Sequence, residues 1–219
     1  MCYPTPMRDV IRHQVRLCTN PTCGLRFPVM ERDTRGYLCP RCGSPTDTAV
    51  GLYEEHKAPR PVSCGGTPRM EVLLDNIRSI YNVGSIFRTS DGAGVSHIHL
   101  CGITPTPDNP RLKKTALGAD EAVPWSYHQD GHRAAGELIA QGKRLWALEG
   151  GVRSTPIAQV TPGEDGRPVV LVIGNEICGV DPGILSICEQ VLGIPMQGVK
   201  TSLNTAVAFG IAVYTLRSS

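Results

Sequence analysis

Residues 169–176 read VVLVIGNE, and this stretch decides the fold. Five apolar residues in a row, 169–173, leave no polar face, as is typical of a strand that is buried on both sides. Such strands occur in parallel sheets whose connections are helices. The acid that follows, Glu176, stands on a glycine-flanked turn at the strand's end, where α/β sheets place their ligands. The stretch therefore predicts an α/β domain with a site at that edge of the sheet.

Strand and helix signals alternate on both sides of this stretch, from residue 70 to the end of the chain. The alternation predicts a mainly parallel sheet covered by helices. Ser202 or Asn204 is the expected cap of the last helix. Strands are expected at residues 71–74, 96–101, 122–127, 144–148, 169–173 and 191–196, and helices at 83–89, 131–141, 182–190 and 202–216.

The chain before residue 70 has a different character. Residues 1–45 contain a cluster of cysteines and are expected to form a small metal-binding module. Residues 46–69 carry several prolines and glycines and are expected to be a linker. Residues 70–219 then form the α/β domain.

Four cysteines of the first module have the spacing of a metal site: Cys18, Cys23, Cys39 and Cys42. Two short Cys-turn-Cys knuckles can close a tetrahedron of thiolates, which is the arrangement that Zn²⁺ prefers. The segment is too short to bury a core, so the metal would supply most of its folding energy. A rubredoxin-like iron site uses the same ligands and is the alternative.

Composition places the chain among ordinary globular proteins. It has 219 residues, 41% apolar and 19% charged, and its nine cysteines are an odd number. We find no signal-peptide pattern and no apolar run of about 20 residues, so we expect a soluble cytoplasmic protein without a membrane span. Residues 1–69 hold 10 Lys/Arg and 6 Asp/Glu, a net charge of +4, whereas residues 70–219 hold 12 and 14, a net charge of −2.

Two further segments of the α/β domain carry polar residues at predicted strand ends. In residues 76–88, NIRSIYNVGSIFR, the side chains of Asn82, Ser85 and Arg88 would line one stripe of a helix. Residues 194–204, IPMQGVKTSLN, run from the last strand into the last helix. This second segment departs from a P-loop, because Val199 is inserted before the lysine, so a nucleotide hydrolase is not favoured.

Other polar residues have simpler interpretations. His97 and His99 alternate along one predicted strand and share a face, and we favour packing over a metal pair. Arg111, Lys113 and Lys114 form a basic patch in an expected loop, for which a solvated surface and an RNA contact are equally good interpretations.

Taken together and in this order, the three polar segments resemble the SpoU (TrmH-like) family of the SPOUT methyltransferases. The resemblance covers about two thirds of the chain. It implies an α/β fold with a C-terminal trefoil knot, a homodimer built through the knot region, and binding of S-adenosylmethionine. It also implies methylation of the ribose 2′-oxygen of tRNA or rRNA.

The resemblance also implies roles for matched residues. Arg88 matches a residue proposed in the family as the base, but arginine has a reference pKa above about 12, so we favour an anchor for the target phosphate. The implied catalytic residues are Asn82, Arg88, Glu176, Ser202 and Asn204. The implied cofactor contacts are Gly174, Ile194, Met196 and Leu203.

A second functional hypothesis is a non-catalytic zinc-ribbon protein that binds RNA on a degenerate methyltransferase scaffold. The presence of all five implied catalytic residues favours the enzyme.

Overall fold

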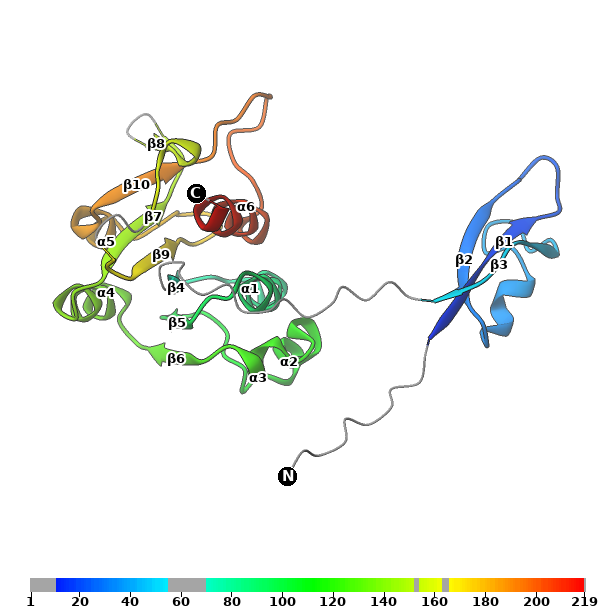
Figure 1. Cartoon of the computed structure of the whole chain (residues 1–219), viewed down its shortest axis with the longest axis horizontal. Helices are drawn as coiled ribbons and strands as arrows, with labels where there is room; N and C mark the ends of the chain where they lie inside the picture. Colours follow the sequence, from blue (N-terminus) through cyan, green and yellow to red (C-terminus); the bar gives the residue numbers. More distant parts are fainter. Residues whose placement is uncertain (1–10, 55–69, 152–153, 163–165, 219) are drawn as a thin grey trace. The chain divides into compact units, whose positions relative to one another are not determined.

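The computed structural model describes residues 11–54, 70–151, 154–162 and 166–218. The chain divides into two compact units, residues 1–63 and residues 64–219. Figure 1 shows both units, coloured along the chain. None of the helices in these ranges has the length and apolarity that a bilayer span requires.

The N-terminal unit is a three-stranded antiparallel sheet with strand order β2-β1-β3. Its strands are β1 (Arg12–Cys18), β2 (Arg26–Met30) and β3 (Thr46–Glu54), and a short 3-10 helix, η1 (Thr34–Tyr37), lies between β2 and β3. The prediction that the linker starts at residue 46 is wrong, because residues 46–54 pair with β1 along its whole length. A two-stranded hairpin is marginally stable alone, and the third strand completes the sheet. The remainder of the predicted linker, residues 55–69, lies outside the described residues.

The C-terminal unit is an α/β domain around a seven-stranded sheet with strand order β6-β5-β4-β9-β7-β10-β8. Every strand pair of this sheet is parallel, which confirms the predicted fold class. The strands are β4 (Met70–Asp75), β5 (His97–Cys101), β6 (Trp125–His128), β7 (Arg144–Leu148), β8 (Thr155–Pro156), β9 (Val169–Ile173) and β10 (Gln190–Gly193). The helices are α1 (Ile80–Ala93), α2 (Pro110–Ala116), α3 (Ala119–Ala122), α4 (Gly131–Ala140), η2 (Ile157–Gln159), α5 (Pro182–Ile187) and α6 (Thr205–Ser218).

Helices cover both faces of this sheet. Figure 1 shows α1 and α6 on one side and α4 and α5 on the other. Two apolar clusters correspond to these layers: Phe87 and Phe209 pack in the first, and Leu138 and Ile184 in the second. Strand β9 lies in the middle of the sheet, and all five of its residues are buried, as the unbroken apolar run predicts.

Several element boundaries differ from those predicted. β7 and β9 match, whereas the predicted strand at 122–127 begins only at Trp125, because Pro124 has no N–H for a sheet ladder. The basic patch at residues 111–114 lies on helix α2 rather than in a loop, because Asn109 caps that helix and Pro110 opens it. The helix predicted over 182–190 ends at 187, and Gln190 already pairs with Trp146 in the sheet.

The last helix begins at Thr205, three residues later than predicted. Asn204 is its cap: the Oδ1 atom accepts hydrogen bonds from the N–H groups of Ala206 (3.0 Å) and Val207 (3.3 Å). Ser202 stays in the preceding loop. Residues 201–203 of that loop line a cavity at the edge of the sheet.

Candidate functional site

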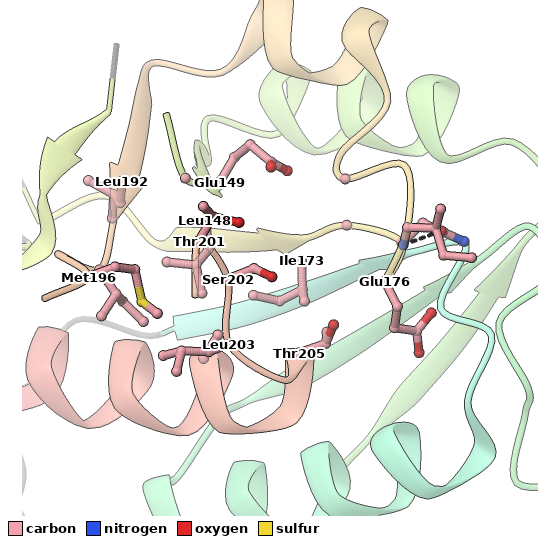
Figure 2. A pocket seen from close by; sticks show the side chains of 17 residues that line it. Leu148, Glu149, Ile173, Glu176, Leu192, Met196, Thr201, Ser202, Leu203 and Thr205 are labelled. Atoms are coloured by element: carbon pink, nitrogen blue, oxygen red, sulfur yellow. Dashed lines mark hydrogen bonds between the residues drawn. The ribbon is translucent and has the colours of Figure 1, made fainter. Parts of the chain in front are cut away.

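A cavity of about 240 Å³ opens where β7, β9 and β10 end. Figure 2 shows its walls, which come from the segment after β9, the segment after β7 and the long segment between β10 and α6. The carboxyl ends of neighbouring parallel strands meet at one edge of the sheet, so the fold itself brings these segments together. The lining residues include Leu148, Glu149, Ile173, Asn175, Ile177, Leu192, Thr201 and Thr205.

All four residues that the family resemblance implies as cofactor contacts, Gly174, Ile194, Met196 and Leu203, line this cavity. Gly174 has a clear steric reason to be glycine. A Cβ atom there would meet the backbone of Gly179 and Val180, which crosses directly over it. The glycine thus lets two stretches of backbone close the floor of the cavity.

The loop after β9 is held in one shape by its own polar groups. The Asn175 side chain accepts hydrogen bonds from the N–H groups of Ile177 (2.9 Å) and Cys178 (3.2 Å). The same side chain donates through Nδ2 to the carbonyl of Asn76 (2.7 Å), which ties the loop to the end of β4.

Glu149 is a polar residue of the cavity that the sequence interpretation missed. Its Oε2 atom accepts a hydrogen bond from the N–H of Val180 at 2.9 Å, and the side chain lines the cavity. Gly179, at φ +74°, leaves room for this carboxylate, because a Cβ atom there would come within 2.6 Å of Oε2. Glu149 comes directly after a predicted strand, and this position was the signal available in the sequence. Glu176 was singled out because it too follows a predicted strand.

Glu176 turns away from the cavity centre towards the start of α1, as Figure 2 shows. Its carboxylate accepts hydrogen bonds from the N–H groups of Arg78 (2.9 Å) and Ser79 (3.0 Å) and from Asn82 Nδ2 (2.9 Å). Partial burial opposes ionisation, but these donors outweigh it and lower the pKa of Glu176 below its ordinary value. Glu176 is therefore an ionised carboxylate that holds the first turn of α1 against the loop after β9.

Asn82 extends this contact to the last helix. Its Oδ1 atom accepts a hydrogen bond from Asn204 Nδ2 at 3.1 Å, while Asn204 caps α6 through its own Oδ1. One chain of hydrogen bonds, Glu176–Asn82–Asn204, therefore joins three segments, and Asn82 is 94 residues from Glu176 and 122 residues from Asn204 in sequence. The structure brings these three predicted catalytic residues together.

The other two predicted catalytic residues lie differently. Ser202 lines the cavity but takes no part in this chain of hydrogen bonds. Arg88 is exposed on α1, nearly two turns beyond Asn82, and is not among the lining residues. Within the described ranges no carboxylate lies close enough to pair with its guanidinium group. A single copy of the protein therefore forms the cavity and its polar border, but Arg88 lies outside that cavity.

The cysteine cluster of the N-terminal unit has the geometry of a metal site. The Sγ atoms of Cys18, Cys23, Cys39 and Cys42 all lie within 4.8 Å of one another. Two of the separations are 3.5 Å, for Cys18 and Cys42, and 3.8 Å, for Cys23 and Cys39. Thiolates around a tetrahedral zinc ion with bonds of about 2.3 Å are about 3.8 Å apart, so this donor set fits the metal.

Turn geometry places those thiols. Gly24 and Gly43 follow the two knuckles with φ of +56° and +72°, a conformation that other residues rarely adopt. Their N–H groups donate to the carbonyls of Asn20 (3.0 Å) and Cys39 (2.9 Å), which closes each knuckle.

The histidines of β5 belong to a separate polar cluster. His99 donates through Nε2 to Glu71 (2.9 Å) and lies 3.1 Å from His128 through Nδ1. His97 contacts Ser126 at 3.0 Å. Among the residues that the structure describes, the four cysteines form the one group of three or more His/Cys/Asp/Glu side chains close enough to hold an ion.

Comparisons with known proteins agree with this geometry. Residues 69–214 match the model of the SpoU rRNA Methylase family. A 23S rRNA (guanosine-2'-O-)-methyltransferase RlmB of Xylella fastidiosa is 29% identical over 166 residues, which are 76% of this chain and 65% of that protein. The chain thus spans just under two thirds of the length of this relative.

A tRNA (guanosine(18)-2'-O)-methyltransferase of Thermus thermophilus is 30% identical over 149 residues, which are 67% of this chain and 73% of that protein. Among solved structures, an AdoMet bound rRNA methyltransferase from Sinorhizobium meliloti is similar, with a TM-score of 0.61 and 26% identity. The match covers 81% of this chain and 65% of that one.

Proposed function

The chain belongs to the SpoU rRNA Methylase family, and from this we propose that it methylates a ribose 2′-oxygen in tRNA or rRNA with S-adenosylmethionine as methyl donor. The observation that carries the proposal is the chain of hydrogen bonds Glu176–Asn82–Asn204 at the border of the cavity. It joins the three sequence segments on which the family resemblance depends. The names of the relatives, which are ribose 2′-O-methyltransferases of rRNA and tRNA, support the same reaction.

The cavity is the proposed binding site of S-adenosylmethionine, which supplies an electrophilic methyl group on a sulfonium when it is bound. Gly174 and Ile194 would contact it through backbone close to the sheet edge, and Met196 and Leu203 through apolar side chains. The AdoMet bound rRNA methyltransferase from Sinorhizobium meliloti supports S-adenosylmethionine as the ligand. Residues 174–177, 179 and 201–203 line the same space, and their polar groups would orient the polar parts of the cofactor.

The protein's own residues mainly position the reacting groups. Glu176 and Asn82 hold the start of α1 at a set distance from the cavity, and Asn204 does the same for α6. Ser202 lies on the cavity wall, where its hydroxyl can contact either substrate. Arg88 anchors the phosphate next to the target ribose, so that orientation of the 2′-hydroxyl supplies much of the rate acceleration.

The proposal includes a homodimer, with the trefoil knot of the family in each chain. Helix α6 carries an exposed apolar stripe at helical spacing: Leu203 just before it, then Val207, Ile211 and Tyr214, which are 37–52% exposed. A two-fold partner would bury this stripe. A second copy would also explain why Arg88 stands outside the cavity of its own chain, since the composite site would then use an arginine from one copy and a cavity from the other.

A structural Zn²⁺ ion in the N-terminal unit is also part of the proposal. The four thiols fit its size and geometry, and no open coordination position is left for a reaction. We also place the protein in the cytoplasm. None of the seven cysteines that the structure describes forms a disulfide, which fits a reducing compartment.

The Arg88→Ala variant tests the proposal. We expect it to abolish transfer of tritiated methyl groups to total RNA from a deletion strain, while calorimetric affinity for S-adenosylmethionine changes less than about twofold. The matched control is Arg133→Ala, which removes an exposed arginine from α4 on the opposite face of the sheet. We expect this variant to keep both methyl transfer and the affinity for S-adenosylmethionine.

Near-normal turnover of the Arg88 variant would remove this residue from the reaction. A wild-type protein that neither binds S-adenosylmethionine nor transfers methyl groups would instead favour a non-catalytic RNA-binding protein. Mapping of 2′-O-methyl marks in RNA from the deletion strain would identify the nucleotide.

A further inference from the structure

We propose that the outer surface of α2, formed by Arg111, Lys113 and Lys114 and called here the α2 basic face, binds the phosphate backbone of the RNA next to the reacting ribose. The inference rests on the proposed function, because it concerns how the RNA substrate reaches that site. It adds a surface that lies outside the three segments on which the family resemblance depends.

The first argument is that these cations have no partner in the described part of the chain. All three side chains are exposed, and none lies within ion-pair distance of a described carboxylate. Six other described cations are paired with acids: Arg12 with Glu31, Arg35 with Asp33, Arg133 with Glu137, Lys143 with Glu71, and Arg144 and Arg167 with Glu189. Three adjacent unpaired cations repel one another, and an anionic ligand relieves that repulsion.

The second argument is that the helix is held firmly and in one orientation. Leu112 and Ala116, four residues apart, are completely buried against the core that includes α1. The opposite side of the helix must then face outwards. Lys114 lies on that side, Arg111 lies beside it one turn earlier, and Lys113 lies at its edge. The α2 basic face is thus a preformed surface rather than a set of side chains on a loose loop.

The third argument is position. Helix α2 packs directly on the first turns of α1: Thr115 lies against Gly84, where no side chain would fit, and its hydroxyl approaches the carbonyl of Ile80. These same turns of α1 carry Asn82, which is hydrogen-bonded to Glu176. The α2 basic face therefore borders the helix that presents Asn82 and Arg88.

The fourth argument is the charge of the whole unit. Residues 64–219 hold 13 Lys/Arg and 14 Asp/Glu, a net charge of −1, so the unit as a whole does not attract a polyanion. An acidic unit that acts on RNA needs a local cationic surface beside its site, because phosphate contacts supply most of the non-specific affinity for nucleic acids. Nucleic acid is favoured over an acidic protein because the phosphates that flank a target ribose must lie close to α1.

The double variant Arg111→Ala/Lys114→Ala tests the proposal in the full-length protein. Both side chains are exposed and alanine favours helix, so we expect the fold to be kept. The probe is unfractionated tRNA in filter-binding measurements between 50 and 200 mM KCl. We expect about tenfold weaker binding at 50 mM and a slope of log K against log salt that is smaller by about 1.4 to 1.8, because two phosphate contacts are lost.

The control is Arg133→Ala/Arg167→Ala, which removes the same charge from arginines that are paired with acids. We expect its affinity and salt slope to stay close to those of the wild type, and S-adenosylmethionine affinity to be unchanged in both variants. An unchanged RNA affinity and slope in the α2 variant, with methyl transfer intact, would overturn the proposal and leave this surface for a protein partner. A wild-type protein that transfers no methyl groups would overturn the proposed function instead.

Discussion

The two units of this chain are stabilised in different ways. Among the described residues of the N-terminal unit, Cys18 and Cys39 are the only buried apolar side chains, while large apolar residues such as Met30, Leu38 and Leu52 are about half exposed. The C-terminal unit buries a continuous apolar core on both faces of its sheet. The comparison teaches that the first unit depends on what its thiols bind, whereas the second depends on hydrophobic burial.

The largest expected effect is confined to the N-terminal unit. In Cys39→Ser/Cys42→Ser we expect loss of zinc and unfolding of residues 11–54, because structural zinc contributes about 10–16 kcal/mol to the folding of such modules. Metal analysis combined with limited proteolysis would measure this, with the C-terminal unit still resistant. The control Cys178→Ser/Cys188→Ser should keep its zinc, and undiminished zinc in the first variant would contradict the assignment.

The reciprocal experiment is a cavity in the core of the C-terminal unit. Phe209 on α6 is fully buried, so Phe209→Ala should destabilise this unit by about 3–5 kcal/mol and leave the zinc content unchanged. Denaturant unfolding followed by tryptophan fluorescence is the measurement, since both tryptophans lie in this unit. Ile139→Ala, at a position that is 39% exposed, should cost less than about 1 kcal/mol. Equal effects of the two changes would argue against a tightly packed core.

A smaller change sharpens the comparison within the C-terminal unit. Gly174→Ala places a Cβ atom against the backbone of Gly179 and Val180, and we expect a loss of about 1–3 kcal/mol together with weaker binding of S-adenosylmethionine. Gly136→Ala, in α4 with open space around it, should instead stabilise the protein by about 0.4–1 kcal/mol. Calorimetry would measure the stability and the S-adenosylmethionine affinity of both variants. Similar values for the two would show that the loop after β9 can shift to make room for a side chain at position 174.

The last prediction concerns pH. Burial opposes ionisation of Glu71, but hydrogen bonds from His99 and Lys143 outweigh it and lower the pKa to about 2 from an ordinary value of 4.5. A carboxyl with a depressed folded-state pKa stabilises the protein above its ordinary pKa, and this contribution disappears as the pH falls towards the folded value. Between pH 5 and 2 the wild type should lose more stability than Glu71→Gln, as measured by urea unfolding. Parallel pH curves would contradict this coupling.

Particular elements show how much the sequence could predict. Residues 169–173 and 144–148 were placed as strands without error, because an unbroken apolar run has few alternatives in an α/β chain. The start of β3 was missed, since glycines and prolines nearby suggested a linker and only the pairing partner β1 makes residues 46–54 a strand. The cap of α6 at Asn204 was one of two candidates, and hydrogen bonds to Ala206 and Val207 distinguish it from Ser202.

By itself the sequence determined the class of the fold, the four-thiol cluster and the three polar segments, because these depend on residue type and local spacing. Only the tertiary structure decided which polar groups meet. Glu176, Asn82 and Asn204 are joined because parallel strands end at one edge, and Glu149 enters the cavity because Gly179 leaves room for it. Arg88 lies outside the cavity because packing of α1 against the sheet sets the position of this helix. No local sequence pattern encodes the distance between Arg88 and the cavity.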